Sequence, residues 1–265
     1  MKKNVVFLVA VKSKDPKLDD KHGGFKYLDV SIRTWKYWCE KNDVELFIYD
    51  TPSEEDTQKY RATWTRWFDV FDQLDSANIS YNKILVVDGS TMVRWDCPNF
   101  FDMVGEDLVA FKAMENMRWV YEAVTGYSGL FNNFEFDCVK YIDCGFQIFT
   151  EKHKQFLAEL KEYYYSNFDV VKHYHDTVKR GTDQTPYNYM LQLKDVKVDV
   201  NGLPSEFMLN HLQRFDWFSH NWQLGDKTPF FLKYGYIWKF SGFPTRGTRY
   251  DLMEQTWQAI KGFYE

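Results

Sequence analysis

An acidic residue followed by glycine and two hydroxyl residues is the first place in this chain where chemistry is expected. The run Ile84–Val87 is short, aliphatic and rich in branched side chains, and Asp88-Gly89-Ser90-Thr91 follows it at once. Such a run, closed by glycine, predicts a buried strand. Ligands of open α/β sheets bind at the carboxyl ends of strands, so the carboxylate of Asp88 and the hydroxyl of Ser90 are predicted to lie at a ligand site.

Other polar residues interrupt apolar or helical patterns further along the chain. Asp143 lies inside the apolar run 141–149, and acids are rarely buried without a partner, which favours a binding site there. Asp183 and Gln184 stand at the start of a predicted helix, a position where an aspartate is also suited to cap the helix. Lys239 lies near the end of a late apolar and aromatic run. These groups offer carboxylates, an amide and one cation to a ligand.

The elements that must position these residues alternate in type through the first half of the chain. Alternation of strand and helix predicts a parallel sheet. We therefore predict an α/β fold, with a mixed, mostly parallel sheet flanked by helices in one domain over 1–265. The predicted strands are 5–11, 44–49, 83–88, 91–95, 107–113, 141–150, 196–200 and 230–240, and the predicted helices are 27–42, 54–74, 152–165, a helix from Asp183, and 250–263. The segment 115–133 is predicted to be irregular, and His173-Tyr174-His175 to lie on a strand.

Composition sets limits on the class of protein. The 265 residues carry 45% hydrophobic and 27% charged side chains, as in ordinary globular proteins. A net charge of −5 argues against a protein that mainly binds nucleic-acid backbone, although a local basic groove stays possible. The four cysteines lack paired CxxC spacing, which predicts a reduced, cytoplasmic protein without structural zinc. No stretch reaches transmembrane length or has the pattern of a signal peptide, so no membrane partner is expected.

Four motifs occur in one order along the chain. They read Val-Val-Asp-Gly-Ser-Thr-Met-Val at 86–93, Tyr-Ile-Asp-Cys-Gly at 141–145, Thr-Asp-Gln-Thr-Pro-Tyr-Asn at 182–188 and Ile-Trp-Lys-Phe-Ser-Gly at 237–242. In this order they resemble the Asp-x-Asp strand, the Asn-Ser-Gly strand, the Asp-Gln-x-x-x-Asn helix start and the late Ile-x-His-Phe-x-Gly strand of GT-A-fold glycosyltransferases. The layout is nearest to the retaining, glycogenin- and galactosyltransferase-like group. Each motif alone is weak, and together they are more specific for the fold than for the substrate.

The resemblance implies one GT-A-like, Rossmann-like domain that binds a nucleotide-sugar donor and a hydroxyl-bearing acceptor. Residues 1–113 would form the nucleotide-sugar-binding half, and 114–265 the acceptor-side half. It also implies a set of site residues. The catalytic residues would be Asp183, Gln184 and Asp143, and the donor-binding residues would be Asp88, Ser90, Arg61, Lys239, Arg246 and Arg249, with Asp88 as a tentative metal ligand.

The chain departs from the family pattern at two positions that hold a divalent metal in the family. Ser90 replaces the second Asp of Asp-x-Asp, and Lys239 replaces the late His. A hydroxyl is a poor single substitute for a carboxylate on Mg²⁺ or Mn²⁺, and a protonated lysine offers only donors. The ammonium of Lys239 could instead neutralise the donor diphosphate. The hypothesis is therefore a weakened metal dependence, or none.

Most of these residues also have a purely structural interpretation. Arg61 and Arg66 fit a solvated helix face, but an arginine fork equally suits a diphosphate or an acidic partner. Arg61 lies where the family often places a donor-contacting basic residue. Asp183 fits a helix cap that needs no substrate. Arg246 and Arg249 fit a surface loop whose Thr248 caps the last helix. The paired histidines His173 and His175 have no matching carboxylates, which favours a structural role.

We predict transfer of a sugar from a nucleotide-diphosphate donor to a hydroxyl acceptor, with retention favoured by the motif layout alone. Two alternatives stay open. The enzyme could resemble phage-encoded glycosyltransferases that modify hydroxymethylated bases in DNA, because base flipping needs only a local basic track and aromatic stacking. Alternatively, the chain could be a nucleotide- or sugar-binding module without catalysis, which the replacements at Ser90 and Lys239 favour.

Overall fold

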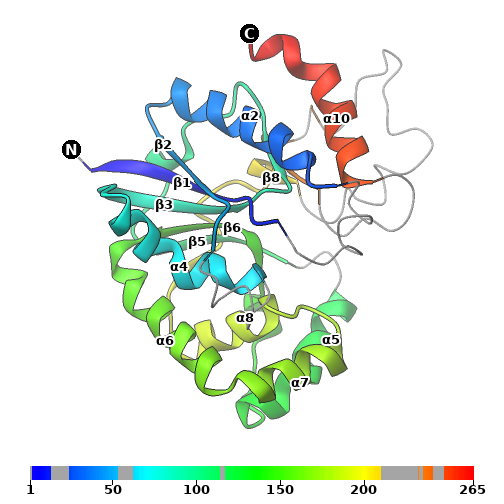
Figure 1. The fold of residues 1–265 in the computed structure, drawn as a ribbon. Coiled ribbons are helices and arrows are strands. Elements are labelled where there is room, and N and C mark those ends of the chain that lie inside the picture. The colour runs from blue at the N-terminus through cyan, green and yellow to red at the C-terminus, as the bar shows by residue number, and fades with distance from the viewer. Residues whose placement is uncertain are drawn as a thin grey trace.

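A computed structural model describes residues 2–12, 24–52, 62–113, 117–209, 232, 235–240 and 248–265 (Figure 1). The strands are β1 Lys3–Val9, β2 Glu45–Tyr49, β3 Tyr81–Asp88, β4 Thr91–Val93, β5 Leu108–Lys112, β6 Ile142–Thr150, β7 Val198–Asp199, β8 Met208–Leu209 and β9 Ile237–Lys239. The α-helices are α2 Tyr27–Lys41, α4 Ala62–Ser76, α5 Met117–Tyr127, α6 Lys154–Ser166, α7 Phe168–Val178, α8 Gln184–Leu193 and α10 Arg249–Ile260.

The main sheet has six strands in the order β2-β1-β3-β6-β5-β7. The pairs β1–β2, β1–β3 and β5–β7 are parallel, and β6 runs antiparallel to both of its neighbours, β3 and β5. The predicted α/β fold with a mixed, mostly parallel sheet is therefore confirmed. Strands of both halves of the chain share this sheet.

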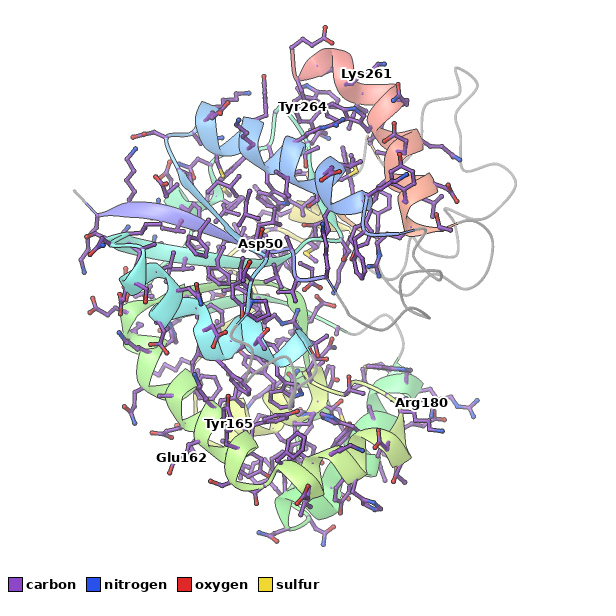
Figure 2. The ribbon with its side chains drawn as sticks, viewed as in Figure 1. Asp50, Glu162, Tyr165, Arg180, Lys261 and Tyr264 are labelled. Carbon is purple, nitrogen blue, oxygen red and sulfur yellow. The ribbon has the colours of Figure 1, made fainter. Side chains whose placement is uncertain are left out.

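The central strands are mostly apolar because helices cover both faces of the sheet (Figure 1). In β3, Ile84 and Val86 pack with α4 and α6 on one face, whereas Leu85 and Val87 pack with α2 on the other. The predicted apolar face of the long helix in the first half is confirmed. All five of its members are buried: Trp64, Trp67, Phe68, Phe71 and Leu74. The charged side chains of Glu162, on α6, and of Arg180, just after α7, point outward to solvent (Figure 2).

A second, three-stranded sheet continues the chain after Asp88. Its order is β4-β9-β8, and the C-terminal helix α10 packs beside α2 over it (Figure 1). Thr248 caps α10, since its side chain accepts a hydrogen bond from the backbone N–H of Asp251 at 3.1 Å. At the far end, the hydroxyl of Tyr264 donates to the carbonyl of Val93 and ties the C-terminus to β4 (Figure 2). None of the described helices is both long and apolar enough to cross a membrane.

Two predictions of local structure were wrong. The segment predicted to be irregular contains helix α5, whose buried residues Val120, Ala123, Val124 and Tyr127 follow helical spacing. His173 and His175 lie on helix α7 instead of a strand, and the ring of His175 is buried against Trp64. In both segments large aromatic residues are frequent, and their high strand propensity is overridden by packing between helices. The N-terminal part of the predicted helix 54–74 lies outside the described residues up to Arg61.

Candidate functional site

The topology brings the four motifs to one edge of the sheet. Asp88 ends β3, level with Val9 at the end of the parallel strand β1. Because β6 runs antiparallel to β3, with Val87 opposite Phe146, its first residues reach the same edge. Asp143 and Gly145 therefore lie beside the end of β3. The chain then turns through Gly89 into β4, where Thr91 pairs with Lys239 of β9.

Glycine is required at position 89 by a close approach between the two neighbouring strands. The amide of Gly89 donates to the carbonyl of Val9 at 2.9 Å. A Cβ at this position would lie 2.5 Å from that same carbonyl oxygen and 2.6 Å from a methyl group of Leu28. A side chain there would push the turn away from β1, so glycine fixes Asp88 at the edge of the sheet.

Lys239 is buried between two of the carboxylates. Its Nζ donates to both carboxylate oxygens of Asp143, at 2.8 and 2.9 Å, and lies 3.8 Å from a carboxylate oxygen of Asp88. The exposed fractions of Lys239 and Asp143 are 5% and 1%. The ammonium thus sits between the strand end of β3 and the start of β6, and it holds together two carboxylates that would otherwise repel each other.

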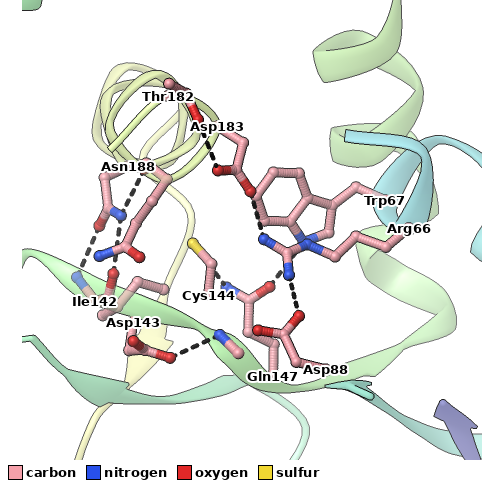
Figure 3. A network of polar contacts seen from close by, with 12 residues as sticks. Arg66, Trp67, Asp88, Ile142, Asp143, Cys144, Gln147, Thr182, Asp183 and Asn188 are labelled. Carbon is pink, nitrogen blue, oxygen red and sulfur yellow. Dashed lines mark hydrogen bonds and ion pairs between the residues drawn. The ribbon is translucent and has the colours of Figure 1, made fainter. Parts of the chain in front are cut away.

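Arg66, on α4, joins the third carboxylate to the same cluster (Figure 3). Its Nη1 donates to Asp88, and its Nη2 donates to Asp183 at 2.5 Å. The guanidinium also lies 4.5 Å from the centre of the indole ring of Trp67. Burial alone would lower the pKa of Arg66, but the carboxylates of Asp88 and Asp183 raise it above its usual value. Arg66 is therefore a fixed cation with two acidic partners, and of its two interpretations the solvated helix face is wrong.

Asp183 occupies the N-cap position of α8 without capping it. Its backbone is in the right-handed helical region, and its side chain makes no cap hydrogen bond. The carboxylate instead points to Arg66 (Figure 3). The structural interpretation of Asp183 as a helix cap is thus wrong. The residue is 9% exposed. Asp183 thus contributes a nearly buried carboxylate to the charge cluster and does not cap the helix.

Asn188, one turn into α8, fastens this helix to the start of β6. Its amide accepts a hydrogen bond from the backbone N–H of Ile142 at 2.8 Å and donates to the carbonyl of Ile142 at 3.0 Å, as a neighbouring strand would. It also donates to the carbonyl of Gln184 at 2.9 Å. The hydroxyls of Tyr141 and Thr185 form a second tie at 2.7 Å. The spacing between the β6 residues and Gln184 is set by these contacts.

We expect the isosteric change Asn188→Asp to disturb this spacing. The carboxylate cannot donate to the carbonyls of Ile142 and Gln184, and each buried group left unpaired costs about 1–3 kcal/mol. If Gln184 acts on the substrate, a shift of about 1 Å is expected to lower the turnover rate on the order of 10²-fold. Thermal unfolding and steady-state kinetics measure the two effects.

The matched control is Asn167→Asp. The Asn167 amide also donates to a carbonyl one helical turn back, that of Tyr163 at 2.8 Å, but at the end of α6, away from the cluster. The control is expected to lose stability without losing turnover per folded molecule. Equal turnover in the two variants would contradict a positioning role of Asn188.

Arg249 lies next to the cluster at the first residue of α10. Its Nε donates to the carbonyl of Phe240 at 2.7 Å, and its guanidinium lies 4.7 Å from the ring centre of Tyr27. Burial raises the pKa of the Tyr27 hydroxyl, and the charge of Arg249 opposes this shift. Ser90 is buried, and its carbonyl accepts from the N–H of Phe240 at 2.7 Å. Arg61 and Arg246 lie outside the described residues.

The cluster has three carboxylates and two cations in alternation, running Asp183, Arg66, Asp88, Lys239, Asp143. One negative charge is left over within this set of five groups. A divalent metal does not fit this arrangement. Asp88 and Asp143 already pair with buried cations, and within the described ranges no three histidine, cysteine, aspartate or glutamate side chains gather as a metal site.

Arg66 was weighed from the sequence but not assigned to the site, and Tyr27 was not considered at all. The sequence carries one signal for Arg66, a cation placed between aromatic residues in Trp64-Thr65-Arg66-Trp67. Where the tryptophans next to an arginine on a helix are buried, that side of the helix offers little solvent-exposed surface for the guanidinium. Tyr27 offers no such signal, because one tyrosine at the start of a helix is an ordinary core residue.

No family model and no curated protein matches the sequence. Among solved structures, the chain matches a glycosyltransferase involved in glycosylation of the major capsid of PBCV-1, with 11% identity, a TM-score of 0.48, and coverage of 94% of this chain and 98% of that one. It also matches the galactosyltransferase LgtC, crystallised with donor and acceptor sugar analogues, with 11% identity, a TM-score of 0.45, and coverage of 98% and 95%. The apo-form glycosyltransferase GlyE of Streptococcus pneumoniae TIGR4 matches at 11% identity and a TM-score of 0.47, over all of this chain and 62% of GlyE.

Proposed function

We propose that this protein is a glycosyltransferase that moves a sugar from a nucleotide-diphosphate donor to a hydroxyl acceptor. One observation carries the proposal: the four motifs of the sequence contribute Asp88, Asp143, Asp183 and Lys239 to one contiguous charge cluster. This cluster lies at the end of β3 in an α/β sheet, the edge where such sheets bind ligands. Buried charges without an evident structural need, gathered at that edge, are typical of functional sites.

The proposed chemistry divides the cluster into two parts. The departing diphosphate gains negative charge, and the cations Lys239 and Arg249 would stabilise it. The reacting sugar gains positive charge at its anomeric carbon, and the carboxylate of Asp183 with the amide of Gln184 would face that centre. Asp88, held between Arg66 and Lys239, would bind a donor hydroxyl. Retention of configuration follows only from the motif layout.

We further propose that turnover needs no divalent metal. The position of the Lys239 ammonium, within hydrogen-bonding distance of Asp143 and 3.8 Å from Asp88, supports this proposal. A metal ion bound at Asp88 would lie close to two fixed cations, Arg66 and Lys239. The electrostatic energy of bringing like charges together is high in a buried site. The cation that the leaving group needs would belong to the protein itself.

A thermal-shift screen over nucleoside diphosphates tests the proposal. Each nucleotide is added with EDTA and, separately, with Mn²⁺, and the donor that stabilises most identifies the base, since ligands raise stability by mass action. The matching nucleotide sugars are then assayed for hydrolysis and transfer. We expect stabilisation and slow donor hydrolysis in EDTA. Inhibition by EDTA that Mn²⁺ reverses would reject metal independence, and binding of no nucleotide would reject the function itself.

A binding module without catalysis is the second candidate function. The observation in its favour is that Asp88, Asp143 and Asp183 are all neutralised by buried partners, as in a cluster built for stability. The same screen separates the two candidates. Tight nucleotide binding without hydrolysis or transfer, at any metal concentration, would favour the module.

The acceptor can be a glycan hydroxyl or, as the sequence leaves open, a hydroxymethylated base in DNA. Transfer to modified duplex DNA that falls steeply with added salt would support the DNA acceptor, because contacts to phosphates are lost as salt rises. Transfer to sugar acceptors without that salt dependence would support a glycan acceptor.

A further inference from the structure

We infer that Asp143 and Gly145 are positioning residues, which hold the Lys239 ammonium in place as the cation for a diphosphate. This inference rests on the proposed function. Asp143 then acts by holding Lys239 and not by direct contact with the sugar. Gly145, too, acts by positioning Lys239. The two residues act on Lys239 in different ways, one through charge and the other through empty space.

The carboxylate of Asp143 is fully engaged with protein groups. Its oxygens accept from Lys239 at 2.8 and 2.9 Å, and one of them also accepts from the backbone N–H of Gly145 at 2.6 Å. The side chain is 1% exposed. A substrate hydroxyl would have to displace these partners to reach it, so the carboxylate acts through Lys239.

Gly145 clears the path that the lysine side chain takes. A Cβ at this position would lie 2.4 Å from Nζ and 2.6 Å from Cε of Lys239, which is closer than non-bonded atoms approach a Cβ. The ammonium therefore rests directly on the backbone of Gly145. Any side chain at position 145 would push the end of the lysine out of its present place.

The contacts with Asp143 and Gly145 leave one N–H donor of the Lys239 ammonium available to a ligand. A lysine ammonium has three N–H donors on a flexible stem. Among the described residues, Lys239 donates hydrogen bonds only to the two oxygens of Asp143, and Asp88 at 3.8 Å is beyond hydrogen-bonding distance. Two donors thus fix the ammonium, and the third points to no described partner. This is the arrangement expected of a cation that is held in place to meet a phosphate oxygen.

The test compares Gly145→Ala and Asp143→Asn with the wild type and with Gly105→Ala, where an added Cβ would meet nothing within 4 Å. Dissociation constants are measured by calorimetry in EDTA for the nucleoside diphosphate found in the screen, for its nucleoside, and for inorganic pyrophosphate. We expect both site variants to bind the diphosphate and pyrophosphate about 10-fold or more weakly, a factor that corresponds to about 1.4 kcal/mol, with the nucleoside unchanged. The control should match the wild type.

The outcomes separate the inference from the function beneath it. A wild type that binds no nucleoside diphosphate rejects the proposed function. A wild type that binds it, with both site variants binding equally well, overturns only the positioning role. Equal weakening for nucleoside and diphosphate would mean a general structural defect and would also overturn it. If Gly145→Ala does not fold, the nearly isosteric Asp143→Asn decides, and failure of both variants to fold would make the pair purely structural.

Discussion

Replacing Arg66 by methionine is expected to destabilise the protein by about 3–5 kcal/mol, because the change leaves one nearly buried and one partly buried carboxylate without their shared cation. Asp88 and Asp183 would then face each other across a space that held the guanidinium. A loss of this size is a large fraction of the 5–15 kcal/mol that stabilises a typical domain. Chemical denaturation at neutral pH measures it, provided that the unfolding is two-state.

The same substitution at an exposed ion pair gives the matched control. Lys154→Met removes a bridge to Asp75 of 2.6 Å whose side chains are 47% and 48% exposed. Such surface pairs contribute about 0–1 kcal/mol, so the control should unfold close to the wild type. A loss in Arg66→Met no larger than in Lys154→Met would contradict the burial of an uncompensated charge.

The conservative change Arg66→Lys distinguishes charge from geometry. An ammonium is a point charge, whereas the guanidinium fork reaches Asp88 with one nitrogen and Asp183 with the other. We expect the lysine to recover part of the stability but to leave one carboxylate poorly paired. If the proposed function holds, turnover should stay low in Arg66→Lys, because Asp183 is no longer held at its place.

Replacing Lys239 by alanine is expected to lower the rate of sugar transfer on the order of 10²–10³-fold, the usual effect of removing one group that stabilises developing negative charge. Under the proposed function, the ammonium held between Asp88 and Asp143 is the cation that stabilises the charge gained by the leaving diphosphate. The binding constant for the nucleoside diphosphate should weaken in parallel. The measurement is transfer or donor hydrolysis in EDTA, normalised to folded protein.

Metal addition sharpens the test of Lys239. Without the ammonium, Asp88 and Asp143 offer two carboxylates on either side of the space that Nζ occupied, and carboxylate oxygens are the ligands that Mg²⁺ and Mn²⁺ prefer. We expect Mn²⁺ to restore part of the activity of Lys239→Ala and to have no effect on the wild type. The control Lys172→Met removes an exposed lysine paired with Asp176 and should behave as the wild type does. Wild-type activity that needs Mn²⁺ would refute the role of Lys239.

The sequence alone predicted most of the elements and the residues of the candidate site. Apolar runs predicted the central strands, because a strand buried on both faces must be apolar throughout, as Ile84–Val87 is. Helical spacing predicted α2, α6 and α10 within a few residues of their observed ends. The aromatic segment that forms α5 was missed, since its residues favour strands and only packing against α7 and α8 selects the helix. Four short motifs also singled out Asp88, Asp143, Asp183 and Lys239, which the structure brings into one charge cluster. Their role as site residues stays a prediction.

Only the tertiary structure decided which charges pair. Arg66 and Asp183 are separated by 117 residues, and Lys239 and Asp143 by 96, and no local pattern reports a contact over such distances. The pairing of Arg66 depends on how α8 and β3 pack beside α4, so its aromatic sequence neighbours hint at burial but do not report which carboxylates it meets. The same holds for Asp183. Its position at the start of a helix predicts a cap, and only the tertiary structure shows that it pairs with the Arg66 guanidinium instead. Short-range sequence patterns fix local conformation, whereas the partners of buried charges are fixed by how distant elements pack.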